Sequence, residues 1–349
     1  MDEEKRSKTE CFINKIAKEQ DFRYLLSKPI RLSTLYWYVA SLRMLQIPFS
    51  KFSIPREEII EYVYKCRNKD GLFGGEIGYP SNILATLNAL QIFYVCKEQF
   101  YDTSIIGTIL ENFVDKETGA VKACKLGEFD TRYSCCLILI LGLLLNNIEH
   151  SDDIFVNRKK NLSSAFNAEN FLKLIKHPRK NVLCRHLNKI ESVNLQNYLY
   201  KIVEFMLKCQ NEDGGFGALP NCESHAANTF CVISSLRVLG LLNLIDTDKV
   251  ADNIVFRQQT DGGFNGRINK KPDVCYSYWA YMCLVMMDKG DYIGTNELRT
   301  FIYSCLDDDG GFCDRKGNEP DLFHTLYALM SLSILGDKNL DYADPGYGI

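Results

Sequence analysis

The sequence lacks the features that mark several common protein classes. No apolar run approaches the roughly 20 residues that a membrane-spanning helix needs. The longest, Cys135 to Leu145, has eleven residues and predicts a buried helix. No block of like charge stands out and the net charge is -3, which argues against binding nucleic acid through a basic surface. The polar N-terminus MDEEKRSKTE has no apolar signal region, and the C-terminus has no CaaX-like lipidation motif. We therefore expect a soluble, cytoplasmic protein without a membrane span.

Cysteine, by contrast, is abundant, with 14 residues in a chain of 349. Without a secretion signal these thiols do not indicate a disulfide framework, so we expect them to be reduced and mostly buried. The apolar content of 46% is enough for a substantial core. The length fits one large domain or two ordinary ones, and the repeat described next favours a single domain over residues 1–349.

A degenerate repeat centred on Asp-Gly-Gly-Phe runs through the chain. Its clear copies are KCRNKDGLFGG, KCQNEDGGFGA, RQQTDGGFNGR and SCLDDDGGFCD, with Phe at positions 73, 216, 264 and 312. The last two intervals are 48 residues, and the first, 143, is close to three times 48. A weaker copy, KETGAVKA, places Val121 48 residues after Phe73. A period of this length indicates stacked structural units.

Each unit has an apolar segment of helical period on both sides of the glycines, such as IIEYVYKC and ILATLNALQIFYV. The glycines permit a tight turn between the two helices and let the Phe fold back onto the core. Five marked units, with an earlier hairpin around Arg31–Leu45 and Glu58–Cys66, predict about six helical hairpins. We expect an all-α fold of the α/α barrel (toroid) type rather than an open solenoid, because the polar loops would then gather at one end.

The segment from 149 to 191 interrupts this repeat. It is rich in Asn and Lys, lacks a Gly-Gly-Phe signal, and contains one short helical pattern, FNAENFLKLIK. We predict a surface insertion, partly disordered. His177 and His186 lie within it and are weak candidates for metal binding.

The stretch GRINKKPDVCYSYW, from Gly266 to Trp279, concentrates the chemistry. Positive charges suited to an anion come from Arg267, Lys270 and Lys271. Two residues that begin a zinc site are Asp273 and Cys275. Aromatic side chains suited to an apolar group are Tyr276, Tyr278 and Trp279. The combination predicts a ligand with an anionic head and an apolar body.

Equivalent repeat loops supply the missing partners. Asp130, His225 and Asp273 lie nine residues after Val121, Phe216 and Phe264, and His324 lies twelve after Phe312. Equivalent loops of a ring converge on one mouth, so Asp273, Cys275 and His324 predict a three-ligand zinc site with an open position, the catalytic form. The residues placed to hold a diphosphate leaving group through charge-assisted bonds are His225, Arg267, Lys270 and Tyr276.

The motifs ESHAANTFC, GRINKKPDVCYSYW and PDLFHTLY, with the Gly-Gly-Phe loops before them, resemble those of protein prenyltransferase β subunits over almost the whole chain. The resemblance implies an α/α barrel bound to a separate α subunit. It also implies transfer of a prenyl group from its diphosphate to a cysteine thiolate, with formation of a thioether. One zinc, held by Asp273, Cys275 and His324, would bind that thiolate. By this resemblance, the prenyl diphosphate site consists of His225, Arg267, Lys270 and Tyr276. The lipid and peptide cavity is lined by Trp279, Arg132 and Cys231.

Three branches of the family differ in lipid and acceptor. The motifs ESHA, PDVCYS and FHTL, with LSTLYW at Leu32–Trp37, most resemble the branch that transfers geranylgeranyl to Rab GTPases. The farnesyl branch has a Trp where Ser33 aligns, and the smaller Ser leaves space for a longer lipid. The implied partners are an α subunit in an obligate heterodimer, geranylgeranyl diphosphate, and a Rab presented by an escort protein. The β subunits of CaaX-type geranylgeranyltransferase and farnesyltransferase are the alternatives.

Asp314 raises the question of a second metal. It lies ten residues before His324, where the farnesyl branch has an Asp associated with magnesium, so magnesium is a further candidate cofactor. An ion pair with the adjacent Arg315 or Lys316 is the simpler interpretation.

Two interpretations come from other classes. A non-catalytic helical ring that keeps a structural zinc is the first, and the intact Arg267, Lys270 and His225 argue against it. The second is another α/α barrel enzyme, such as a terpene cyclase or a glycosidase. Asp307–Asp309 is the only aspartate-rich candidate for a cyclase, and no pair of facing carboxylic acids suggests a glycosidase.

Overall fold

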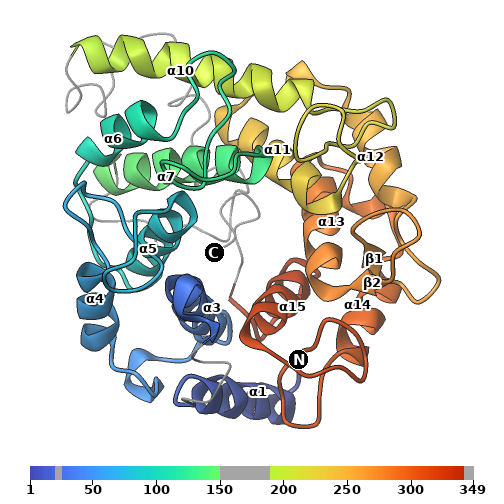
Figure 1. Cartoon of the computed structure of the whole chain (residues 1–349). Coiled ribbons are helices and arrows are strands. Elements are labelled where there is room, and N and C mark those ends of the chain that lie inside the picture. The colour runs from blue at the N-terminus through green and yellow to red at the C-terminus, as the bar shows by residue number, and fades with distance from the viewer. Residues whose placement is uncertain (20–25, 150–188, 342–349) are drawn as a thin grey trace.

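The computed structural model describes residues 1–19, 26–149 and 189–341, and these form a closed ring of helices in two layers (Figure 1). The inner layer consists of α3 (Arg31–Met44), α5 (Ile83–Val95), α7 (Thr131–Glu149), α11 (Ala226–Leu239), α13 (Val274–Met286) and α15 (Leu322–Ile334). The outer layer consists of α1 (Glu3–Ile16), α4 (Arg56–Lys65), α6 (Ser104–Asn112), α10 (Lys189–Lys208), α12 (Thr247–Val255) and α14 (Thr295–Ser304). Each outer helix precedes its inner partner, which confirms the predicted α/α barrel of about six helical hairpins.

The inner layer closes on itself. Each inner helix packs against the next inner helix along the chain, and α15 packs against α3. Inner helices are apolar over most of their circumference because neighbours cover them on several sides; α5, for example, buries ten of its 13 residues. Outer helices bury only one stripe, as α12 does with Val250, Ala251 and Ile254. This difference explains why strongly apolar and amphipathic helical segments alternate along the sequence.

A loop of common design connects the two helices in five of the six hairpins. Phe73, Phe216, Phe264 and Phe312 are fully buried in four of these loops, and Val121 is fully buried in the fifth. Each of the five forms an antiparallel bridge with a residue at the end of the preceding helix. In three loops the pairing extends further, through the bridges Gly74–Ser81 and Lys122–Phe129 and through the strands β1 (Phe264–Asn265) and β2 (Pro272–Asp273). The 48-residue repeat is thereby confirmed, including its weak copy.

A hydroxyl group thirteen residues later fixes each buried Phe to the inner helix. It accepts the Phe backbone N–H at 2.9 to 3.1 Å in the pairs Phe73–Thr86, Phe216–Thr229, Phe264–Ser277 and Phe312–Thr325. The weak copy has Ser134 at this position, but its buried hydroxyl has no hydrogen-bond partner among the described residues. The weak copy therefore lacks this lock between loop and helix.

The first glycine of the repeat is required for both its conformation and its lack of a side chain. Gly262 has φ +92°, and a Cβ there would lie 2.1 Å from the carbonyl oxygen of Glu297 in α14. Gly119, in the weak copy, has φ +78° and would place a Cβ 2.3 Å from the carbonyl oxygen of Lys201 in α10. Each of these loops therefore packs directly on the backbone of the next outer helix.

Backbone hydrogen bonds also connect neighbouring hairpins at the start of the inner helices. The N–H of the first inner-helix residue, or of the second in α3, donates to a carbonyl two residues after the repeat Phe or Val of the next hairpin. The five bonds, 2.9 to 3.1 Å long, are Leu32–Gly75, Ile83–Ala123, Thr131–Ala218, Ala226–Gly266 and Val274–Asp314. Within the described ranges, the interface between α15 and α3 has no equivalent bond. We call this interface the seam.

A cavity of about 830 Å³ lies beside the seam. Its walls come from α1, α3 and α4, with Leu322 of α15 completing them. Ile59 and Tyr62 of α4 are among the lining residues, together with Arg31 and Leu35 of α3. In each of the five hairpins that have a glycine loop, that loop instead contacts the outer helix of the next hairpin around the ring.

Two features differ from the sequence-based expectations. The helix Arg31–Met44 forms its hairpin with α1, whereas Glu58–Cys66 falls in and directly after α4, the outer helix of the following hairpin. α1 is hard to detect because it buries only Thr9, Phe12 and Ile13. The predicted insertion, with His177 and His186, lies outside the described residues except for its ends in α7 and α10.

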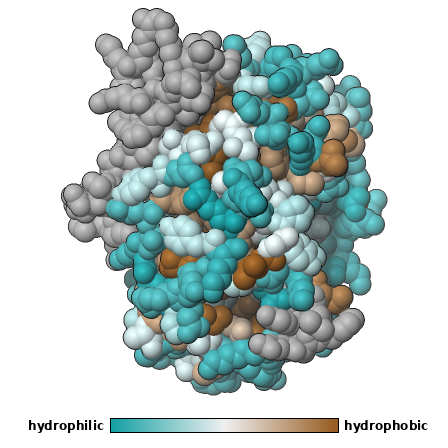
Figure 2. Space-filling view, turned by 60° about the vertical axis from the view of Figure 1, so that its left-hand side comes forward, coloured by the Kyte–Doolittle hydropathy of each residue, from teal (hydrophilic) through white to brown (hydrophobic). Residues whose placement is uncertain are grey.

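The surface is mainly hydrophilic on the face that Figure 2 shows, with hydrophobic side chains in small groups between polar ones. None of the helices in the described part of the chain is both long enough and apolar enough to cross a membrane.

The hydroxyl lock leads to a stability prediction. Thr229→Ala removes the acceptor of the buried Phe216 N–H, so we expect the free energy of unfolding to fall by about 1–3 kcal/mol. Ser134→Ala is the matched control, because it removes a buried hydroxyl at the equivalent position that makes no such bond. We expect it to cost less than Thr229→Ala in urea unfolding. Equal losses in the two variants would show that the bond contributes nothing.

Candidate functional site

The candidate site is built on the residues that immediately precede the inner helices. In all five glycine loops, the residue nine positions after the buried Phe or Val accepts a hydrogen bond from a backbone N–H in the helix's first turn. These N-cap residues are Asn82, Asp130, His225, Asp273 and Asp321. Because the hairpins are all oriented alike around the ring, their caps surround one mouth. The loops that build the fold thus also bring the polar groups together.

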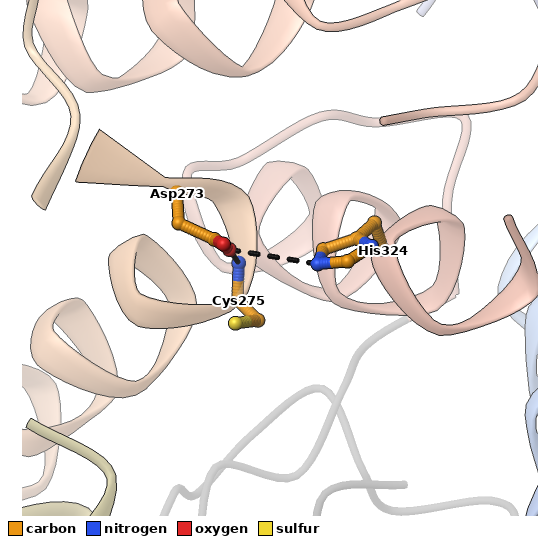
Figure 3. Close-up of side chains that lie close together, drawn as sticks. All are labelled: Asp273, Cys275 and His324. Carbon is orange, nitrogen blue, oxygen red and sulfur yellow. Dashed lines mark hydrogen bonds and ion pairs between the residues drawn. The ribbon is translucent and has the colours of Figure 1, made fainter. Parts of the chain in front are cut away.

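Asp273, Cys275 and His324 converge at this mouth from two neighbouring helices, α13 and α15 (Figure 3). Each offers one ligand atom, and these three atoms lie within 4.8 Å of one another. His324 Nε2 is 3.6 Å from Asp273 Oδ1, which also accepts the Cys275 N–H at 2.8 Å. The sequence-based grouping of these three residues is therefore seen in the structure, although 49 residues separate Cys275 from His324.

Asp321 orients the histidine of this group. Its Oδ2 lies 2.7 Å from His324 Nδ1, and its Oδ1 accepts the His324 backbone N–H at 2.8 Å. With Nδ1 bound to a carboxylate, Nε2 is the ring nitrogen directed at Asp273 and available as a ligand. Burial lowers the pKa of His324, but the hydrogen bond and charge of Asp321 outweigh it and the net shift is upward.

The environment of Cys275 favours a thiolate only when a cation is bound beside it. The residue is 5% exposed, and burial together with the neighbouring Asp273 carboxylate raises the pKa of its thiol far above the usual range. A thiolate at this place therefore needs a positive partner. Carboxylate oxygen, thiolate sulfur and imidazole nitrogen are all donors that zinc accepts, so the residues present fit a zinc ion.

His225 lies beside this group as the N-cap of α11. Its Nδ1 accepts the Ala227 N–H at 3.1 Å, so in the neutral ring Nε2 carries the proton and is a donor. Burial, with the positive charges of Arg267 and Arg257, lowers the pKa of His225 to about 4. The imidazole is therefore neutral near pH 7. Its ring makes an edge contact with Tyr276, with centroids 5.2 Å apart.

The two cationic candidates of this region are on the surface. Arg267 is half exposed and forms an ion pair of 3.6 Å with Glu223. Lys270 is exposed, and in the described part of the chain its ammonium group forms no hydrogen bond or ion pair. The structure thus places Arg267 near His225 and Tyr276, while it leaves the Lys270 side chain without a contact to either.

A chain of aromatic contacts leads away from His225 and Tyr276 along the inner helices. Ring centroids are 5.8 Å apart for Tyr276 and Trp279, 6.2 Å for Trp279 and Phe323, and 5.0 Å for Phe323 and Trp37. Three helices contribute, α13, α15 and α3, so the contacts cross the seam. We call Tyr276, Trp279, Phe323 and Trp37 the aromatic wall. Tyr327 and Phe230 extend it on either side of Trp279.

Three further candidates occupy separate positions. Ser33 is buried in α3, and its hydroxyl donates to Asn88 Oδ1 on α5 at 2.6 Å. Arg132, at the start of α7, forms a two-pronged ion pair with its own cap residue Asp130. Cys231 lies partly buried in α11, where a hydrogen bond with Cys135 on α7 and burial raise the pKa of its thiol.

The ion pair predicted for Asp314 is present in the structure. Its carboxylate pairs with Arg315 at 2.6 Å and accepts from Asn318 at 2.7 Å. Its backbone carbonyl accepts from Val274 and so belongs to the links between hairpins.

Sequence analysis missed part of the site. Asp321 lies nine residues after Phe312, the same offset that the other caps have, but only His324 was selected from this loop. Phe323 and Tyr327 lie within the motif PDLFHTLY without an assigned role. Tyr327 lies three residues after His324 and four after Phe323, so it shares a face of α15 with each of them, a helical-spacing signal that was available.

Comparison with solved structures gives the fold independently. The chain superposes on a structure described as Candida albicans protein geranylgeranyltransferase-I complexed with GGPP, with a TM-score of 0.73 and 20% identity. The superposition covers 98% of this chain and 94% of that one. At this identity the likeness supports the toroid architecture.

Curated relatives are closer in sequence. The chain is 31% identical over 270 residues to the geranylgeranyl transferase type-2 subunit beta of Candida albicans, and 30% identical over 247 residues to that of Saccharomyces cerevisiae. These matches cover 72% and 67% of this chain, but only 64% and 58% of the two relatives. A family profile described as the prenyltransferase alpha-alpha toroid domain matches residues 5–349. The two-layered ring with its five repeat loops is thus the architecture of that profile, and the chain belongs to the prenyltransferase alpha-alpha toroid family.

Proposed function

We propose that the chain is the catalytic β subunit of a protein geranylgeranyltransferase of the Rab type. It would transfer geranylgeranyl from its diphosphate to C-terminal cysteines of Rab GTPases. One observation carries the proposal: Asp273, Cys275 and His324 meet at the mouth of a prenyltransferase toroid, beside His225 and Tyr276. The two relatives named as type-2 β subunits support this branch over the CaaX-type branches.

Asp273, Cys275 and His324 would hold one zinc ion. When bound, zinc supplies the positive charge that keeps an acceptor cysteine as a thiolate near neutral pH. In the reaction a bond forms between the thiolate sulfur and the allylic carbon of the lipid, while the bond from that carbon to the diphosphate oxygen breaks. The protein's part is to hold these atoms in line and to stabilise the charge that develops on the diphosphate.

His225, Arg267, Lys270 and Tyr276 would bind the diphosphate. The neutral His225 donates from Nε2 without a change of protonation, because its pKa of about 4 lies well below neutral pH. Arg267 offers a planar pair of donors at the rim. The exposed Lys270 is on the same loop and can add charge once the ligand is present. Magnesium at Asp314 is a weaker part of the proposal, since Arg315 already neutralises that carboxylate.

The lipid chain would lie along the aromatic wall, which begins at Tyr276 and ends at Trp37. Trp279 is at its centre, while Arg132 and Cys231 would line the lipid and peptide cavity from α7 and α11. Ser33, one helical turn before Trp37, would leave room for the end of a geranylgeranyl chain. The small size of Ser33 is the feature that favours geranylgeranyl over farnesyl.

An α subunit would cover part of the mouth. Large apolar side chains are exposed there on three consecutive hairpins: Leu26, Ile30, Ile77, Tyr79, Leu84, Leu126 and Phe129. Leu126 is 96% exposed, which is costly for an apolar side chain that faces only water. A heterodimer with an α subunit, to which an escort protein presents the Rab, would bury such a surface.

The branch is tested by prenyl transfer with the chain co-expressed with its α subunit. Farnesyl and geranylgeranyl diphosphate are offered with a CaaX peptide, and with a Rab plus escort protein. We expect geranylgeranyl transfer to the Rab alone, because Ser33 admits the longer lipid and the acceptor is presented by the escort. Transfer to the CaaX peptide would move the chain to a neighbouring branch.

The zinc site is tested with Cys275→Ser and His324→Ala. We expect both variants to lose bound zinc, measured by elemental analysis, and transfer activity, while the helical circular-dichroism signal stays unchanged. Cys283→Ala, in the same helix and fully buried, is the control for loss of a thiol, and we expect it to keep its zinc. Full activity of either ligand variant would contradict the assignment.

The role of Asp321 is tested with Asp321→Asn, which keeps an N-cap oxygen but removes the charge behind His324. We expect zinc affinity, measured by chelator competition, to fall by about 10- to 100-fold. Asp246→Asn changes a cap at α12, away from the ring's mouth, and is expected to leave zinc affinity as it is. An unchanged affinity in Asp321→Asn would remove Asp321 from the site.

A further inference from the structure

The aromatic wall ends at α3, where buried polar side chains follow it. Trp37 contacts Phe323 across the seam and is the last ring of the wall. Ser33 precedes it by four residues and so lies on the same helix face, one turn nearer the mouth. From Ser33 the contacts continue to α5 through side chains of another kind: Asn88 and Gln91 are amides, whereas the wall consists of rings.

These polar residues form a continuous hydrogen-bonded chain. The Ser33 hydroxyl donates to Asn88 Oδ1 at 2.6 Å, and Asn88 Nδ2 donates to Gln91 Oε1 at 2.9 Å. Exposed fractions are 6%, 4% and 5% for Ser33, Asn88 and Gln91. Asn88 is the central member, and the two bonds fix which end of its amide faces Ser33. Such a fully buried chain resists displacement because each broken bond would leave a polar group unsatisfied.

An isoprenoid chain has no group that can replace these bonds. A lipid that lies along the aromatic wall therefore finds favourable contacts as far as Trp37 and an unfavourable surface at the amide of Asn88. A residue larger than Ser at position 33 would shorten the available length from one side. The Asn88 amide would limit it from the other side, since entry of further carbon atoms requires its hydrogen bonds to break.

We infer that Asn88 is a specificity-determining residue that sets the upper limit on lipid chain length, as the centre of the hydrogen-bonded chain Ser33–Asn88–Gln91. The inference rests on the proposed function, because it takes a prenyl diphosphate as the ligand of the aromatic wall. It adds a second determinant, on a different helix, to the effect of Ser33.

The test compares prenyl diphosphates of 15, 20 and 25 carbon atoms as substrates of the wild-type and variant heterodimers. Asn88→Ala removes the amide and opens space beside Ser33. We expect kcat/KM for the 25-carbon substrate, relative to the 20-carbon substrate, to rise by about tenfold or more. Asn88→Ser replaces the amide with a smaller hydroxyl side chain that can still hydrogen-bond; it is expected to shift the ratio in the same direction and serves if Asn88→Ala does not fold.

Asn228→Ala is the matched control. Asn228 is also a buried amide on an inner helix, and its Nδ2 donates across to Thr131 Oγ1 on α7 at 2.9 Å. The same deletion there is expected to lower the melting temperature comparably and to leave the 25-to-20-carbon ratio unchanged. A general loosening of the ring would instead change the ratio in both variants and would overturn the inference.

The remaining outcomes separate the two levels of the argument. If the wild type transfers the 20-carbon lipid and the folded Asn88 variants keep its ratio within twofold, the inference about Asn88 is wrong and the proposed function stands. If the wild type transfers none of the three lipids to any acceptor, the proposed function fails and the inference fails with it.

Discussion

The ring depends on one kind of contact, the backbone hydrogen bond from the start of an inner helix to the loop carbonyl of the next hairpin. A bond such as Val274–Asp314 satisfies an N–H group that a helix start would otherwise leave unpaired. Five repetitions set the position of each hairpin relative to the next. Because each contributes only about 0.5–1.5 kcal/mol, the bonds set the register of the ring more than its stability, which comes from the apolar inner helices.

The site is a consequence of the same register. A residue directly before an inner helix has to accept N–H groups of the first turn, and Asn, Asp and His side chains can all do so. Asn82 only caps its helix and Asp130 also pairs with Arg132, whereas His225 lies beside the group that contains Cys275 and Asp273 belongs to it. The fold thus permits polar side chains at the mouth in every hairpin, and different residues at equivalent positions give the mouth its chemistry. Stability and function share these residues, so their effects have to be separated by variants that keep the cap.

The sequence predicted much of this arrangement because the repeat is explicit. The spacing of Phe264 and Phe312 indicated the ring, and offsets of nine and twelve residues from them assigned Asp273 and His324 to equivalent loops without any structural information. Side-chain partners were not predictable in the same way. The pairing of Ser33 with Asn88 depends on how two helices cross. The Lys270 side chain has no partner among the described residues, and this depends on the path of an exposed loop. α1 was missed because a helix with only three buried residues has little apolar signal.

The seam differs from the other inner-helix interfaces in how far apart its two helices are in the sequence. Five of the six inner-helix interfaces join hairpins that follow one another in the chain, so these contacts have low contact order and need no distant partner. The interface of α15 with α3 joins the first hairpin to the last, and its formation carries the entropy cost of closing nearly the whole chain into a loop. Among the residues that the structure describes, this interface lacks the backbone bond that the others have, and it borders the cavity lined by Arg31 and Leu322. We therefore expect ring closure to be the final folding step. Reopening at the seam is the expected first step of unfolding, with Trp37 and Phe323 parting before Asp273, Cys275 and His324 do.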